Sequence, residues 1–337
     1  MAEVSRSALI GLLLAAALWN VGLVAMLPAA VMASLLGLTP VVGLRALVAK
    51  RRSPAASPLL GRLAGALTVG SAAVYLASFF AIGDGGVPVT RRVAEPAAEV
   101  AQLRLVDFNV LHGYPRFAGQ EERYGKLLAA LAALEPTVIV LQEAWSVVGH
   151  GALAQRLGAD LGLDVAYARA NGSRRLLGFE EGSAVLSRLP IVSARRLVLA
   201  PRRPFWEARI ALVVELATGP GTTLAVVATH LSNRGGELAF RQARDLAARL
   251  AGELTIVAGD LNAPSGSPAV GVFEALGLVD AVPGGIDHVL VHGEAPWRVE
   301  RSGWTLRPQE LAALIGEEIE ISDHPGIVVD LRRVLRL

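Results

Sequence analysis

Two short stretches of the sequence place polar side chains directly after apolar runs. Val-Val-Ala-Thr ends at His230, and Thr-Ile-Val-Ala-Gly ends at Asp260, with Asn262 two residues further on. Apolar, β-branched runs of this length predict buried strands, and α/β proteins carry much of their chemistry at strand ends. An imidazole, a carboxylate and an amide together could bind a metal ion or a phosphate group. Gly-Asp-x-Asn-x-Pro is also typical of an Asx-turn without any catalytic role, so both interpretations stay open here.

Other apolar runs end in the same kinds of side chain. These positions are Asn109, Glu143, Asp287 and the pair Asp323 and His324. Turns after strands often hold Asn or Asp, so each position alone has an ordinary structural explanation. A whole set of acids, amides and imidazoles at strand ends favours one shared site for a metal ion and a phosphate group.

The spacing of apolar residues predicts the elements that position these side chains. Spacings of three and four predict helices over 121–134, 152–161, 237–250 and 268–276. Apolar runs and alternation predict strands over 103–111, 137–141, 183–186, 191–199, 209–216, 287–291 and 326–331, besides those that end at His230 and Asp260. Runs of strands mixed with separated helices predict an α+β sandwich, with two sheets inside and helices outside.

Seven stretches, in order, carry a resemblance to a known family. They are DFNVLHG, VLQEAW, SAVLSRLPI, ATHLSN, GDLNAP, IDHVLV and SDHPGIVV. The chain from about Leu103 to Leu337 resembles the endonuclease/exonuclease/phosphatase superfamily, which has the DNase I fold and includes abasic-site endonucleases, neutral sphingomyelinases and inositol polyphosphate 5-phosphatases. It is similar in particular to the membrane-anchored bacterial branch. The resemblance implies a four-layer αββα sandwich (DNase I-like) over residues 101–337.

The resemblance also implies a role for each strand-end residue. Glu143 and Asn109, supported by Asp323, would hold a divalent cation, Mg²⁺ or Mn²⁺, which oxygen ligands suit. Asp260 and Asn262 would orient the attacking water and bind a phosphate oxygen. His324, with one ring nitrogen held by Asp287, would handle protons, and His230 would stabilise negative charge on the phosphoryl group. The sequence leaves open whether Asp260 or His324 is the general base.

Several other residues are weaker candidates. Arg188 and Arg209 beside strands, and Arg174 and Arg175 in a loop, could contact phosphate or substrate, although unpaired surface arginines are common. His112 is either a support for the Asn109 strand end or a turn residue. His288 should face away from Asp287 and be structural, while His150 and His292 are expected at the surface.

One position departs from the family pattern. Members that cut at abasic sites have a carboxylate two residues after the asparagine, where this chain has Leu111. This difference disfavours a repair nuclease and leaves the lipid, phosphatase and DNase branches.

The first hundred residues predict a membrane anchor. Residues 8–44 contain no charged side chain, and 63–83 form a second uncharged apolar run. Because one span needs about 20 apolar residues, we expect three transmembrane helices, at about 8–27, 29–48 and 63–83. Buried helices of a soluble core are the alternative, and a cleaved signal peptide fits poorly because its apolar core is shorter. Residues 84–100, rich in Gly and Pro, are expected to form a linker.

The basic residues predict the orientation. Arg6 precedes the first run, and five cluster between the two runs, at Arg45, Lys50, Arg51, Arg52 and Arg62. Basic residues stay in the cytoplasm, so two spans and then a third would carry residues 101–337 to the extracytoplasmic side. The predicted location is therefore the cell membrane, multi-pass, with the catalytic domain outside.

Charge bears on the substrate. The chain has a net charge of +2, but residues 1–100 hold eight basic and four acidic side chains, which leaves 24 basic and 26 acidic ones in 101–337. A domain of this balance is not a general nucleic-acid-binding domain. We therefore expect a metal-dependent phosphoesterase acting on a lipid-linked phosphate or diphosphate at the bilayer. An extracytoplasmic DNase-like endonuclease, which would have nucleic acid as its partner, is the alternative, and a non-catalytic membrane scaffold is a third.

Overall fold

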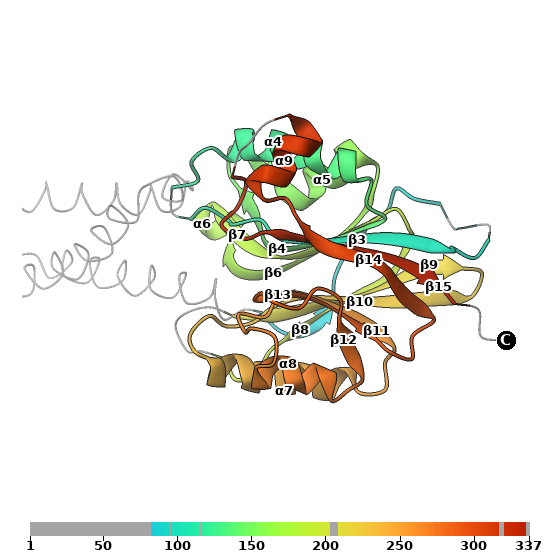
Figure 1. Cartoon of the computed structure of the whole chain (residues 1–337). Coiled ribbons are helices and arrows are strands. Elements are labelled where there is room, and N and C mark those ends of the chain that lie inside the picture. Colours follow the sequence, from blue (N-terminus) through green and yellow to red (C-terminus); the bar gives the residue numbers. More distant parts are fainter. Residues whose placement is uncertain are drawn as a thin grey trace, which may run out of the picture.

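The computed structural model describes residues 82–94, 96, 98–114, 116–202, 208–316 and 320–334 of the 337-residue chain. Within these residues two β-sheets lie face to face, and helices cover the outer face of each sheet (Figure 1). The four layers confirm the predicted αββα sandwich. The predicted spans lie outside the described residues, apart from residues 82 and 83. None of the helices in the described part is long and apolar enough to serve as a membrane span.

The first sheet is eight-stranded and contains the Asn109 and Glu143 strands. Its order is β14 (Trp297–Thr305), β15 (Gly326–Arg333), β3 (Gln102–Asn109), β4 (Val138–Val147), β7 (Phe179–Ser187), β6 (Asp164–Ser173) and β2 (Val89–Thr90), with β5 (Gly151–Ala152) paired to β4. The helices α4 (Gln120–Leu134), α5 (Leu153–Leu161) and α9 (Pro308–Ile315) cover its outer face (Figure 1).

The second sheet is seven-stranded and contains the His230 and Asp260 strands. Its order is β1 (Gly85–Gly86), β8 (Ile191–Val198), β9 (Ile210–Gly219), β10 (Thr222–His230), β11 (Thr255–Asp260), β13 (Asp287–His292) and β12 (Leu278–Asp280). Its outer face packs on α7 (Gly236–Leu250) and α8 (Pro268–Glu274) (Figure 1). A short helix, α6 (Arg174–Leu177), joins β6 to β7.

Each sheet has one parallel pair of strands, and these pairs fix where the polar residues meet. Asn109 of β3 is in register with Gln142 of β4, and His230 of β10 is in register with Asp260 of β11. Asn109 Nδ2 lies 3.2 Å from Asp260 Oδ2 across the two sheets, so both pairs end at the same edge of the sandwich. We call this the polar edge, and the end where β10 begins at Thr222 is the opposite edge.

Strand alternation explains why apolar runs deliver polar groups into one space. In β10, Leu224, Val226 and Ala228 face the core between the sheets, so His230, which continues the same alternation, faces that space too. The other strands follow the same rule, with Leu105 before Asn109, Ala258 before Asp260, Val140 before Gln142, and Asp287 before Val289. The site is thus the polar continuation of the inter-sheet core.

The structure extends the predicted elements and adds others. The predicted strand 137–141 continues to Val147, and the strands β6 and β14 and the helix α9 were not predicted. The edge strand β14, of sequence WRVERSGWT, is mostly exposed, carries three charged side chains and lacks a clear apolar alternation. Helix α9 begins with Pro308 at its first turn, where the missing N–H is tolerated.

The segment predicted as a free linker is part of the domain. Gly85 and Gly86 pair with β8, and Val89 and Thr90 pair with β6, so the segment joins an edge of each sheet. The predicted third span also ends too late, because Ile82 is 3% exposed and packs in the core between the sheets. The Gly and Pro content predicted a flexible linker. Instead, backbone pairing with β8 and β6 and the buried Ile82 just before the segment hold it against the domain.

Candidate active site

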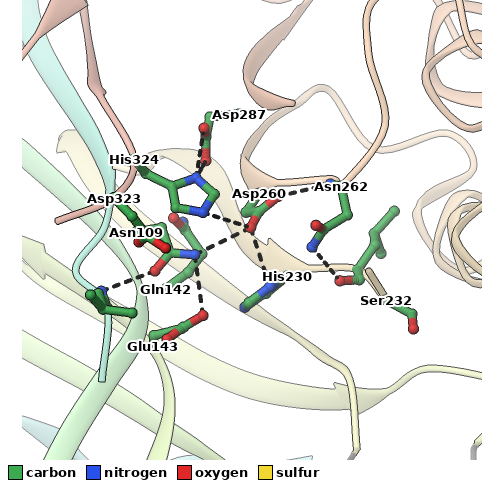
Figure 2. A network of polar contacts seen from close by, with 12 residues as sticks. Asn109, Gln142, Glu143, His230, Ser232, Asp260, Asn262, Asp287, Asp323 and His324 are labelled. Carbon is green, nitrogen blue, oxygen red and sulfur yellow. Dashed lines mark hydrogen bonds and ion pairs between the residues drawn. The ribbon is translucent and has the colours of Figure 1, made fainter. Parts of the chain in front are cut away.

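The polar strand ends form one connected network between the two sheets (Figure 2). The first sheet supplies Asn109 and Glu143, and the second supplies His230, Asp260 and Asp287. The segment that precedes β15 supplies Asp323 and His324. The structure thus brings together every residue that the sequence assigned to catalysis or to the metal ion.

The Gly-Asp-Leu-Asn stretch is shaped by a close approach of two strands. Gly259 has φ of 141°, and a Cβ there would lie 1.9 Å from the carbonyl oxygen of Thr229. Only glycine fits this position. Asn262 adopts φ of 49° and donates its backbone N–H to Asp260 Oδ1 at 2.8 Å. The Asx-turn is therefore present, and it orients the carboxylate that lies in the site.

Asp260 is the centre of the network. Its Oδ2 lies 3.2 Å from Asn109 Nδ2, 3.3 Å from His230 Nε2 and 3.8 Å from His324 Nε2. Burial, together with the charge of Asp287, raises the pKa of Asp260 to about 6. A carboxylate with this pKa can both carry charge and accept a proton near neutral pH.

His324 and Asp287 form the predicted pair. His324 Nδ1 lies 3.1 Å and 3.0 Å from the two carboxylate oxygens of Asp287, which assigns the Nδ1 proton and leaves Nε2 toward Asp260. Burial lowers the pKa of His324, but the hydrogen bond that it donates to Asp287 and the charges of Asp287, Asp260 and Asp323 outweigh this effect and raise the pKa to about 9. The imidazole is thereby held as a cation facing the site.

Glu143 sits at an irregularity in β4. The register with β7 shifts between Leu141 and Ala144, and Glu143 has φ of 55°. A left-handed backbone at a non-glycine residue costs about 1–3 kcal/mol and persists where its surroundings fix it. The bulge re-aims the side chain, whose Oε1 lies 3.4 Å from Asn109 Nδ2 and whose Oε2 accepts the backbone N–H of His112 at 3.0 Å.

Asp323 is held close to Asn109 by its neighbour in the chain. Ser322 Oγ donates to the carbonyl oxygen of Asn109 at 2.7 Å and lies 3.3 Å from Asp323 Oδ1. Figure 2 shows Asp323 beside Asn109, on the side of the network that also holds Glu143.

The side of the site around Glu143 offers the oxygen ligands that a hard divalent cation prefers. Glu143 and Asp323 supply carboxylate oxygens, and Asn109 lies between them. A second group, Asp260, Asp287 and His324, also places its ligand atoms within 4.8 Å of one another. There, however, both Asp287 oxygens already accept the His324 Nδ1 proton.

His230 is a buried, neutral imidazole. Burial lowers its pKa well below the usual value, and the nearby charges of Arg209, His324 and His112 lower it further. His230 Nε2 faces Asp260, so the ring can donate a hydrogen bond without carrying a charge. Arg209, at the start of β9, is buried at the polar edge, as its candidate role requires.

The other arginine candidates lie elsewhere. Arg188 follows β7 at the opposite edge and donates from Nε to the carbonyl oxygen of Pro136 at 2.9 Å, so its predicted phosphate contact is wrong. Arg174 and Arg175 are exposed on α6, beyond the polar edge, and none of the described contacts joins them to the network. They line a hollow of about 590 Å³ with Val148 and Tyr167.

The remaining histidines divide as the sequence suggested. His112 reaches Glu143 through both its backbone N–H and its ring, which makes it a support for the site rather than a turn residue alone. His288 is fully buried between Asp280 and the carbonyl oxygen of Ala263, each at 2.8 Å, and is structural. His150 lies near Glu121, and His292 Nδ1 accepts the N–H of Glu294, both away from the network.

Sequence reasoning missed several residues that support the site. Gln142 Nε2 donates to Asp107 Oδ1 at 2.8 Å, directly below the network, and burial raises the pKa of Asp107 well above its usual range. Arg123 of α4 holds the loop after β3 by donating to the carbonyl oxygens of Val110 and Leu111. Strand alternation could have found Asp107, because it lies two residues before Asn109 on the same face of β3.

An aromatic group flanks Glu143 at the polar edge. Phe179 stacks on Tyr114 with ring centroids 5.3 Å apart, and it also contacts His112 at 5.7 Å and Phe117 at 4.9 Å. Tyr114 is 45% exposed. These rings come from segments more than 60 residues apart, so no local pattern in the sequence could indicate them.

Comparison with known proteins identifies the family of the chain. The profile of the Endonuclease/Exonuclease/phosphatase family matches residues 108–324, from β3 to His324. The chain therefore belongs to this family of phosphoester hydrolases. None of the curated protein sequences gives a significant match.

Solved structures share the fold. An endonuclease/exonuclease/phosphatase from Beutenbergia cavernae DSM 12333 is 21% identical, with 69% of this chain and 72% of that chain covered and a TM-score of 0.53. The human Nocturnin catalytic domain with bound sulfate is 21% identical, with 69% and 94% covered and a TM-score of 0.56. ANGEL2, a 2',3'-cyclic phosphatase in complex with adenosine-2',3'-vanadate, is 15% identical, with 70% and 96% covered and a TM-score of 0.54.

Proposed function

We propose that the chain is a membrane-anchored, divalent-metal-dependent phosphoester hydrolase that acts on a lipid-linked phosphate or diphosphate at the extracytoplasmic face. The observation that carries the proposal is the meeting of Asn109, Glu143, Asp260 and the His324–Asp287 pair in one network between the sheets. The uncharged runs at 8–44 and 63–83 support the membrane part.

Glu143, Asn109 and Asp323 would hold Mg²⁺ or Mn²⁺. The cation, when bound, would polarise the phosphoryl oxygens and offset their negative charge. The protein's own contribution is to hold the surrounding donors rigid. Ser322 and His112 fix the positions of Asn109 and Glu143, so the site does not need to reorganise when substrate arrives.

Asp260 is placed to take a proton from the attacking water, and His324 is placed to stabilise the phosphoryl group. The water oxygen forms its bond to phosphorus, its proton goes to Asp260 Oδ2, and the bond to the leaving oxygen breaks. Asp287 keeps the His324 proton on Nδ1, so Nε2 can donate to a phosphoryl oxygen. His230 donates from the second sheet, and Asn262 fixes Asp260 through its backbone N–H.

The substrate test uses detergent-purified full-length chain with Mg²⁺ and with chelator. Polyprenyl diphosphate, phosphatidyl lipids, inositol phosphates and plasmid DNA are offered separately, and phosphate release or nicking is measured. We expect the lipid substrates to be hydrolysed only with the metal ion. Faster cleavage of DNA, with a steep loss of activity as salt rises, would instead support the nuclease alternative. No hydrolysis of any substrate, together with failure to bind Mg²⁺ or Mn²⁺, would support the scaffold alternative.

The orientation has its own test. A phosphatase reporter fused after Leu337 should be active in cells, because the predicted third span carries the domain outward. A silent phosphatase reporter with an active cytoplasmic reporter at the same position would reverse the proposed localisation.

A further inference from the structure

The described chain begins at the polar edge, in contact with both sheets. Ile82 is buried between the sheets, and its carbonyl oxygen accepts a hydrogen bond from Arg202. Gly83 is bound through its carbonyl oxygen to Arg196 Nε at 2.8 Å. Asp84 accepts the backbone N–H of Val198 at 2.7 Å and pairs with Arg249 at 3.0 Å. These contacts attach the start of the domain to the last residue of β8.

Strand register shows how close this attachment is to the site. Val198 is in register with Ile210 of β9, and the next residue, Ala211, is in register with Thr229, directly before His230. Val198 and His230 therefore lie at the same height, at the polar edge. Three strand spacings separate β1 from β10, roughly 14 Å at about 4.8 Å per spacing. From there β1 runs away from the site, toward the opposite edge.

Because of this attachment, residues 84–100 do not form the free spacer between an anchor and the domain that the sequence suggested. A free linker over 84–100 could have held the site up to roughly 60 Å from an anchor, at about 3.3–3.6 Å per residue. Among the described residues, Ile82 is the first to make a hydrogen bond, and it lies within the predicted third span of 63–83. An anchor that ends just before Ile82 would therefore be separated from the polar edge by only a few residues.

The polar edge has surface chemistry that suits a lipid headgroup layer. Helix α6 follows Ser173, which is in register with Phe179, and Phe179 in turn is in register with Val147. Val147 lies four residues past Glu143, so α6 projects beyond the site. Arg174 and Arg175 are exposed there, next to Val148, which is 39% exposed, and Tyr114 is exposed beside Phe179. Basic and aromatic side chains favour the interface of an anionic bilayer.

We infer that the polar edge faces the bilayer, so that the active site opens toward anionic lipid headgroups and takes its phosphate group directly from the membrane surface. The inference rests on the proposed function, of which it specifies the direction and the source of substrate. The opposite edge, with the β9–β10 hairpin at Thr222 and Thr223, then points away from the membrane.

The cysteine-free sequence gives a direct test. Single variants Arg175→Cys at the polar edge and Thr223→Cys at the opposite edge are made in the full-length chain and labelled with one fluorophore. Thr223 is exposed and lies seven residues before His230, roughly 23 Å along β10 at about 3.3 Å per residue. The labelled proteins are reconstituted into phosphatidylcholine–phosphatidylglycerol vesicles with and without a nitroxide-headgroup lipid.

We expect the quencher lipid to reduce fluorescence several-fold at position 175 and to leave position 223 almost unchanged. Equal quenching at both positions, or stronger quenching at 223, would overturn the inference. Hydrolysis by the same labelled proteins is measured in parallel. Hydrolysis without selective quenching at 175 refutes the inference alone, whereas selective quenching without hydrolysis of any phosphoester refutes the proposed function alone.

Discussion

Charged side chains are paired and partly exposed at the opposite edge of the sandwich, whereas two carboxylates are buried at the polar edge. At the opposite edge, Arg104 donates from Nε and Nη2 to the two oxygens of Asp330 at 2.7 and 3.1 Å, with side chains 40% and 25% exposed. At the polar edge, Asp260 and Asp287 are buried together, and burial and the charge of Asp287 raise the pKa of Asp260. Exposed, paired charges contribute little to stability, whereas buried like charges cost free energy. The buried carboxylates, which lower the stability of the folded state, are the groups that can take part in catalysis.

The largest expected effect is on catalysis at the polar edge. Asp260→Asn and His324→Gln should each lower kcat by about 10²–10⁴-fold, because each removes a group that handles a proton or charge in the transition state. The thermal midpoint of Asp260→Asn should stay the same or rise, since a buried carboxylate is replaced by a neutral side chain. Arg188→Gln, at the opposite edge, is the matched control and should keep its activity. Activity near wild type in both site variants would remove the network from the mechanism.

The next effect concerns the cation. Saturating Mn²⁺ or Mg²⁺ should raise the thermal midpoint of the wild type, by roughly 5–10 °C at about a hundredfold excess over the dissociation constant. Glu143→Gln should lose most of this rise, because it removes the carboxylate that the bulge in β4 aims into the site. Differential scanning calorimetry with and without metal measures both. An undiminished rise in the variant would place the cation at the Asp260, Asp287 and His324 group instead.

A smaller effect comes from Glu181, a buried carboxyl at the polar edge that accepts from Asn171. Burial raises its pKa above the usual value, so the folded state binds more protons than the unfolded state as pH rises above about 4.5. The wild type should therefore lose stability as pH rises from there through the raised folded pKa. Glu181→Gln should be more stable than the wild type at pH 7–8, with the difference shrinking toward pH 4. Urea unfolding across pH measures this, and a difference that grows at low pH would contradict it.

The smallest effect is expected at the opposite edge. Arg104→Gln should change the free energy of unfolding by about 1 kcal/mol or less, because its pair with Asp330 is partly exposed and screened. Activity should not change. A loss of several kcal/mol would mean that the two edges do not differ in the way proposed.

Much of the fold and most of the site could be predicted because the signals are local. Apolar runs that end abruptly at His230 and Asp260 show both the strand and the polar group it delivers. The register of the parallel pairs then brings such ends together without further information. Gln142 was missed because it directly precedes Glu143, and alternation alone would place two neighbours on opposite faces of the strand. The register shift in β4 between Leu141 and Ala144 allows both to reach the site.

Strand direction limits such prediction. Arg188 and Arg209 both flank strands, yet β7 ends at the opposite edge while β9 begins at the polar edge. Sequence adjacency to a strand does not tell which edge a residue occupies, since that depends on the direction of pairing. The segment 84–100 was misjudged for a related reason, because its edge pairings are made with β8 and β6, which lie far along the chain.

The most direct test of the central claim is the rate of phosphate release from polyprenyl diphosphate in mixed micelles by purified full-length protein. With Mg²⁺ the wild type should release phosphate, and chelator, Asp260→Asn and His324→Gln should each abolish most of that release while Arg188→Gln retains it. Release that is unaffected by chelator and by both substitutions, or absent from the wild type with every phosphoester offered, would contradict the account.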